Sequence, residues 1–156
     1  MNMDNYRIVP ELNEEERDLG VMDVSLYDEA GTLLGKIHLT DKSAIRDLDA
    51  GRDPEFNPYA NFVGCETQAE DKDQVKEILE HIFEYLAQKG VKEVSYNATN
   101  KTKEPFLKNI GFELKEENTD GFYPILIYRR ALSDDAGAGF LSQAKQHGAD
   151  STWGNF

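Results

Sequence analysis

Residues 73–112 read DQVKEILEHIFEYLAQKG, then VKEVSYNATN, then KTKEPFLKNIGF, and this stretch decides the fold. Its first part carries apolar residues at the spacing of one helical face, which predicts an amphipathic helix. Asp71 and Asp73 are suitable caps for the start of this helix, and Gly90 suits its left-handed end. The apolar face comprises Val75, Ile78, Leu79, Ile82, Phe83 and Leu86.

A strand and a shorter helix follow within the same stretch. Residues 91–96 indicate the strand, and Phe106, Leu107 and Ile110 give the shorter helix its apolar face before Gly111 ends it. A helix that leaves one strand and enters a neighbouring one normally makes a right-handed crossover on a sheet. The stretch therefore predicts a helix packed against a sheet.

The remaining chain supplies more strands. Turn residues at 28–31 (DEAG) join two of them into a hairpin. We expect Pro10 to end the first strand and residues 43–48 to form at most one helical turn. The predicted strands are residues 6–9, 21–27, 32–39, 59–66, 113–116 and 122–130. This order predicts an α/β (α+β) fold with a mixed central sheet flanked by helices.

Composition narrows the class of protein. The 156 residues suit one domain, and no apolar run or signal-peptide pattern predicts a membrane protein. One cysteine, Cys65, and three scattered histidines predict neither a disulfide nor a metal site, and Cys65 is expected to be a buried thiol. The net charge of −13 argues against direct nucleic-acid binding and suits a basic partner, although solubility alone also explains it.

The composition changes after residue 132. We assign residues 1–132 to one domain and residues 133–156, rich in Gly, Ala and Ser, to a flexible or partner-bound tail. Isolated apolar side chains in such a tail are natural anchors for a protein partner. These anchors are Phe140, Leu141, Trp153 and Phe156.

Three features together resemble the Gcn5-related N-acetyltransferase (GNAT) superfamily over roughly residues 21–132. They are the hairpin LYDEAGTLLGKIHL, the helix and strand at 73–96, and Asn97 and Asn100 followed by Phe106 and Gly111-Phe112. The resemblance implies the acyl-CoA N-acyltransferase fold, binding of acetyl-CoA between two diverging strands, and transfer of the acyl group to an amine. The family's long first helices are not evident before Val21.

The resemblance also implies site residues. Glu66, near the end of a strand, corresponds to the family's general base, and it also reads as a surface glutamate. Asn97 and Asn100 match positions that contact the cofactor, and Asn100 equally suits a capping turn. No metal ligand set is implied.

Two other elements of the family pattern are not matched. The loop that holds the cofactor's pyrophosphate aligns with Glu70, Asp73 and Val75, which put acid where phosphate should lie. The tyrosine that protonates the departing thiolate is replaced by Leu107, with Tyr96 and Tyr123 as the available substitutes. These departures predict a degenerate acyl-CoA site.

Three functions follow from this balance. The first is a binding or assembly component with a GNAT-like fold, since the run FLKNIG (106–111) resembles degenerate GNAT-like internal virion proteins of short-tailed phages. The second is an active acetyl-CoA-dependent N-acetyltransferase that uses an amine acceptor. The third is an acidic decoy of a nucleic-acid-binding protein. The expected location is the cytoplasm, or the virion if a phage encodes the chain.

Overall fold

The structure is a computed structural model, and it describes residues 6–132. The predicted tail, with Phe140, Leu141, Trp153 and Phe156, lies outside the described residues. Within them the elements are β1 (Arg7–Leu12), η1 (Arg17–Leu19), β2 (Val21–Tyr27), β3 (Leu33–Thr40), α1 (Lys42–Asp49), β4 (Tyr59–Thr67), α2 (Lys72–Gln88), β5 (Glu93–Ala98), α3 (Glu104–Asn109), β6 (Glu113–Asn118) and β7 (Ile125–Ala131).

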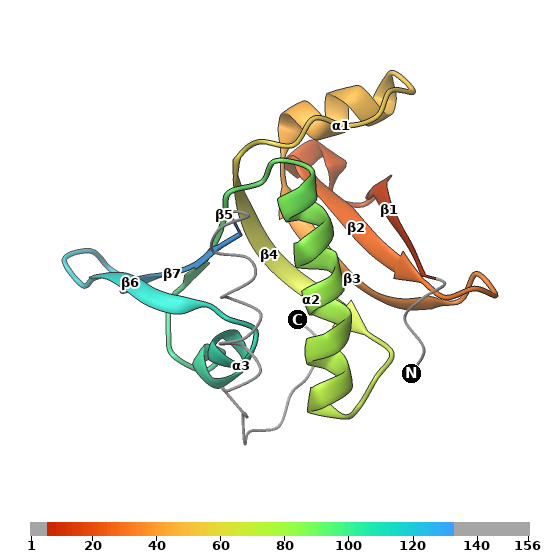
Figure 1. The fold of residues 1–156 in the computed structure, drawn as a ribbon. Coiled ribbons are helices and arrows are strands. Elements are labelled where there is room, and N and C mark those ends of the chain that lie inside the picture. The colour runs from red at the N-terminus through yellow and green to blue at the C-terminus, as the bar shows by residue number, and fades with distance from the viewer. Residues whose placement is uncertain (1–5, 133–156) are drawn as a thin grey trace.

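The strands form one mixed sheet in the order β1-β2-β3-β4-β5-β7-β6. All neighbouring strands are antiparallel except β4 and β5. Figure 1 shows α2 lying along the sheet, α3 near β6 and β7, and α1 by β1 and β2. The crossover predicted for the deciding stretch is therefore confirmed, because α2 connects the parallel strands β4 and β5.

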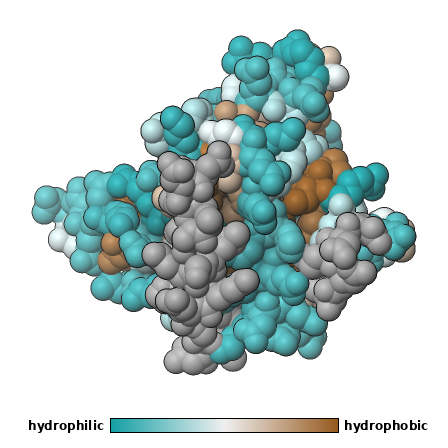
Figure 2. All heavy atoms as spheres, viewed as in Figure 1, coloured by the Kyte–Doolittle hydropathy of each residue, from teal (hydrophilic) through white to brown (hydrophobic). Residues whose placement is uncertain are grey.

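The apolar face of α2 is buried as its spacing predicts. All six residues of that face are at most 4% exposed, and they pack with alternate residues of the sheet such as Val24, Ile37 and Leu39. Figure 2 shows the outward surface of the helix covered by hydrophilic residues. The helix approaches β3 so closely that a Cβ atom at Gly35 would lie 2.8 Å from Ile78 Cγ2. Only glycine allows this approach without movement of the helix.

A buried ion pair also connects the helices to the sheet. Arg130 of β7 donates from Nη2 to Glu80 of α2 at 2.7 Å and from Nη1 to the Ile110 carbonyl at 2.8 Å. Its guanidinium lies over the ring of Phe83, 4.5 Å from the centroid. Arg130 is 3% exposed, and burial lowers its pKa despite the opposing effect of Glu80. The pair therefore joins α2, α3 and β7 inside the protein.

Two local predictions were wrong. Residues 42–49 form a full helix, α1, instead of one turn, because the Asp41 side chain caps it by accepting from the Ala44 N–H at 3.1 Å. Pro10 does not end the first strand, since β1 continues to Leu12 and pairs there with β2. A proline is tolerated in β1 because this is an edge strand of the sheet.

Candidate functional site

The two parallel strands of the sheet diverge. The pairing of β4 with β5 covers only Tyr59–Asn61 and 93–95, although both strands continue beyond it. A bulge follows in β4, where the register with β3 shifts between His38 and Leu39. Because β4 and β5 are parallel, their carboxyl ends lie at the same edge of the sheet, and they separate toward that edge. Helix α2 begins at this edge, directly after β4. This divergence is the first element of the candidate site.

Aromatic side chains fill the helix side of this divergence. The ring of Phe62, from β4, lies 5.8 Å from that of Tyr96, from β5, and 5.6 Å from that of Phe112. Phe62 is fully buried, and Phe83 of α2 packs against it at 6.0 Å. Burial raises the pKa of Tyr96. The divergence therefore lies over an aromatic core.

The start of α2 is acidic. Asp71 is the N-cap, as predicted, and its carboxylate accepts the Asp73 N–H at 2.9 Å. Glu70 precedes the cap, and Lys72 is the only cation among residues 70–75. The partial positive charge of this helix end is therefore met by the protein's own carboxylates.

A cluster of polar side chains, here called the His38 cluster, lies on the opposite face of the sheet and joins β2, β3 and β4. It comprises Asn13, Asp23, Lys36, His38 and Glu66. His38 Nδ1 lies 2.6 Å from Asp23 Oδ1, and its Nε2 lies 3.4 Å from Glu66 Oε2. Lys36 Nζ lies 3.5 Å from Asp23 and 3.8 Å from Glu66, and Asn13 donates to Asp23 at 3.1 Å.

The burial of this cluster changes two pKa values. Asp23 is 5% exposed, and burial alone would raise its pKa, but hydrogen bonds from His38 and Asn13 lower it overall. The hydrogen bond with Asp23 raises the pKa of His38, against the opposing effect of burial. Glu66 and Glu16 add to this increase through their charges. The cluster therefore stabilises the protonated imidazole, which is hydrogen-bonded to Asp23 through Nδ1 and has the Glu66 carboxylate 3.4 Å from Nε2.

This cluster was not predicted, because His38, His81 and His147 are scattered along the sequence. The signal lies in the predicted hairpin, because register places Asp23 opposite His38, and Lys36 opposite Glu66 of β4. Glu66, the predicted base, has a side chain that is 53% exposed and lies at the open edge of the cluster. The structure thus gives it a histidine neighbour that the sequence did not predict.

The two predicted cofactor residues follow the part of β5 that pairs with β4. Asn97 is exposed and stands opposite Ile127 of β7. The Asn100 side chain accepts the Thr102 N–H at 3.0 Å, so it forms the local turn that was the alternative interpretation. Neither residue belongs to the His38 cluster. Their role toward a cofactor stays a prediction.

Of the two tyrosines proposed as substitutes for the missing acid, Tyr96 lies at the divergence of β4 and β5 and stays a prediction, whereas Tyr123 lies far out on a hairpin. Leu107 is fully buried in α3, and Tyr123 is 72% exposed in the β6–β7 hairpin. Tyr128 is buried on β7 and donates to Glu104 at 2.6 Å. Burial and this carboxylate raise its pKa far above its ordinary value. A phenol held in this way is a poor proton donor at neutral pH.

The described residues were also compared with the requirements of a metal site and of a membrane-spanning helix. Among residues 6–132, no three His, Cys, Asp or Glu side chains are grouped in a way that could hold a metal ion. No helix there is long and apolar enough to cross a membrane. Cys65 is buried, as expected.

The fold can be compared with known proteins. The sequence matches no protein-family model and no curated protein. Among solved structures, a variant of spermidine N-acetyltransferase from Vibrio cholerae has a TM-score of 0.51 and 11% identity, covering 81% of this chain and 73% of that chain. A putative N-acetyltransferase from Lactobacillus plantarum has a TM-score of 0.50 and 12% identity, covering 83% and 99%.

A third match, the putative acetyltransferase yncA from Salmonella typhimurium with its cofactor acetyl-CoA, has a TM-score of 0.45 and 13% identity over 78% of this chain and 70% of that chain. The divergence of β4 and β5, the crossover through α2 and the first two matches agree on one architecture. The chain has the GNAT-like fold, a mixed sheet flanked by helices, as its sequence predicted.

Proposed function

We propose that this chain is a GNAT-like protein with a degenerate acyl-CoA site, acting as a binding or assembly component. The observation that carries the proposal is the acidic start of α2, where Asp71 already accepts the Asp73 N–H. In this fold the pyrophosphate of acyl-CoA would be held by the free N–H groups at that helix end. Carboxylates there repel the phosphates and occupy one of the donors they need.

The residues therefore fit only part of acetyl-CoA. The divergence of β4 and β5 offers backbone groups of the kind that could hold the pantetheine arm. The diphosphate end does not fit, and Leu107 supplies no proton for a leaving thiolate. A chain that keeps the packing of the fold and loses these groups is better suited to binding than to acyl transfer.

Assembly is the form of binding that we favour. The run from Phe106 to Gly111 resembles phage internal virion proteins, and the acidic charge suits a basic partner. Residues 133–156 would anchor that partner through their isolated apolar side chains. We expect that deleting residues 133–156 leaves the domain folded and abolishes association with its partner in a pull-down. Unchanged association would remove the tail from the proposal.

Calorimetric titration with acetyl-CoA tests the degenerate site. We expect no saturable binding of the unmodified protein up to about 1 mM cofactor. Asp73→Asn should bind better than Glu84→Gln, because both remove one exposed α2 carboxylate but only the first lies at the helix start. Micromolar binding by the unmodified chain, weakened in Asn97→Ala or Asn100→Ala, would overturn the proposal.

A second candidate function is N-acetyl transfer to an amine. The His38 cluster favours it, because the Glu66 carboxylate is half exposed at the open edge of the cluster, where His38 Nε2 positions it from 3.4 Å. Such a carboxylate could accept the proton that an ammonium acceptor must lose. The test is release of CoA from acetyl-CoA in the presence of polyamines and lysine peptides. Turnover that falls in Glu66→Gln would support this candidate, and no turnover would end it.

A further inference from the structure

The hairpin formed by β6 and β7 exposes large apolar side chains at its tip. Phe122 is fully exposed, and Tyr123 and Ile125 are exposed by 72% and 47%. The three stand within four successive residues, so exposed apolar side chains are concentrated at this tip. Figure 2 shows hydrophobic residues within an otherwise hydrophilic surface at this hairpin. Exposed apolar patches with a polar rim mark interaction sites, so this tip is a candidate for one.

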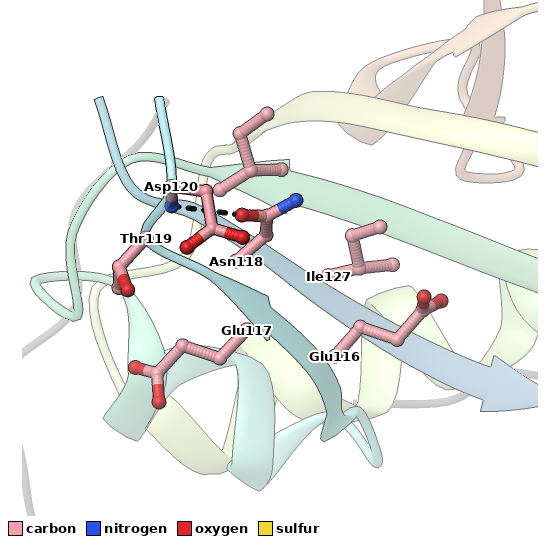
Figure 3. Close-up of a pocket in the computed structure, with 7 residues that line it drawn as sticks. Glu116, Glu117, Asn118, Thr119, Asp120 and Ile127 are labelled. Atoms are coloured by element: carbon pink, nitrogen blue, oxygen red, sulfur yellow. Dashed lines mark hydrogen bonds between the residues drawn. The ribbon is translucent and has the colours of Figure 1, made fainter. Parts of the chain in front are cut away.

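A pocket of about 570 Å³ adjoins this tip. Its walls combine carboxylates with two aliphatic side chains of β7. They are Glu116, Glu117, Asn118, Thr119, Asp120, Ile125 and Ile127. Figure 3 shows Glu116 beside Ile127, and Asn118 and Asp120 near each other where the strand ends. The Asp120 backbone N–H donates to Asn118 Oδ1 at 2.9 Å, so the Asp120 carboxylate is not used in this bond.

The carboxylates of the pocket are only partly neutralised. Glu116 is paired with Arg129, and Glu117 lies 3.8 Å from Lys101. Among the described residues, no cationic group lies within ion-pair distance of Asp120. The pocket therefore keeps a negative charge beside apolar surface, which suits the long aliphatic stem and charged head of lysine or arginine.

The hairpin is also an edge of the sheet. In the part of the chain that the structure describes, β6 pairs only with β7. Its outward backbone groups are available to an extended partner segment. The charged residues and the bulge in β6 disfavour pairing with an arbitrary strand. Phe122 and Tyr123, which follow β6, carry no such charge.

We propose that the β6–β7 hairpin is a docking surface for a basic, extended segment of a partner protein. Apolar residues of that segment cover Phe122, Tyr123 and Ile125, and a lysine or arginine enters the pocket beside Asp120. A second copy of this chain fits poorly, because it brings the same carboxylates and a net charge of −13. A free polyamine would leave the apolar tip uncovered, and nucleic acid or anionic lipid would be repelled.

This docking surface depends on the proposed function in one respect, which is that the chain binds a protein partner. Acetyl-CoA titration decides the state of the acyl-CoA site, whereas peptide titration decides this surface, so the two failures are distinguishable. The probe is the peptide KVKLKVKL with blocked ends, which alternates cationic and aliphatic residues. KSKGKSKG has the same charge without the apolar residues.

Fluorescence anisotropy and amide NMR shifts of the full chain provide the readout. We expect KVKLKVKL to saturate below about 1 mM, with shifts centred on residues 113–127, and KSKGKSKG to bind at least tenfold more weakly, at roughly the level of charge attraction alone. Phe122→Ser/Tyr123→Ser should weaken KVKLKVKL binding by about tenfold or more. Tyr123→Ser alone is compared with Tyr59→Ser as the control, since Tyr59 is 66% exposed at the start of β4 and Tyr123 is 72% exposed.

Charge is tested in the same way. Glu117→Gln/Asp120→Asn should weaken binding several-fold, and the two-charge control Glu14→Gln/Glu15→Gln, on the β1–β2 connection, should not. Equal losses in both pairs would show general attraction to an acidic protein and overturn the proposal. So would the absence of saturable binding, or self-association abolished by Phe122→Ser. Displacement of the peptide by spermidine, with the same sensitivity to Phe122 and Tyr123, would instead assign the surface to a small polyamine.

Discussion

The two faces of the same sheet are built on different physical principles. Toward α2 and α3, alternate residues such as Met22, Val24 and Ile37 are fully buried in an apolar core. On the opposite face, the intervening positions of the same strands carry Asp23 and His38 in an ion-paired cluster. One pattern of alternation thus specifies both the fold and a polar site. The apolar residues of the first face give stability that depends little on pH, whereas the cluster on the second face couples stability to protonation.

The largest expected effect comes from the ion pair buried on the helix side. Glu80→Ala leaves Arg130 charged and buried, and we expect a loss of about 3–5 kcal/mol in the free energy of unfolding. The measurement is urea denaturation followed by circular dichroism. Glu80→Leu/Arg130→Met, which removes both charges and keeps the volume, should recover most of the loss. If the double variant is no more stable than Glu80→Ala, the pair is not the cause.

An intermediate effect is expected on the polar face. His38→Gln removes a charge-assisted hydrogen bond to buried Asp23 and should cost about 1.5–3 kcal/mol near pH 5.5. The cost should depend on pH. Because the pKa of His38 is raised on folding, its contribution is fully present below the unfolded value of about 6.5 and is lost as pH rises through the folded value.

The same cluster sets a limit at acidic pH. Because the pKa of Asp23 is lowered on folding, its contribution is present above about 3.9 and is lost as pH falls through the folded value. The difference between the unmodified protein and His38→Gln should therefore be largest between about pH 4 and 6.5. Urea midpoints from pH 4 to 9 measure it, with His81→Gln on α2 as the control. A difference independent of pH would contradict the ionic account.

The sequence predicted the helix-side face well and the polar face poorly. The period of the α2 residues is a local property, so Val75 to Leu86 were assigned to the core without knowledge of their neighbours. The His38 cluster depends on the register of three strands, which brings together residues as distant as Asn13 and Glu66. Helix α1 was missed because it is short and highly charged, although Asp41 was a visible capping signal.

The smallest effect expected distinguishes the two roles of the acid at the start of α2. Asp71→Ala removes the accepting oxygen for the Asp73 N–H and should cost about 1 kcal/mol, within the range for lost N-caps. Asp71→Asn keeps an accepting oxygen but removes the charge, so it should retain most of that stability while weakening repulsion of phosphate. Thermal unfolding of both variants, with and without acetyl-CoA, measures the two effects separately. If Asp71→Asn is as unstable as Asp71→Ala, the carboxylate stabilises the helix through its charge. Helix stability alone would then explain the acid at this position, without the loss of a cofactor site.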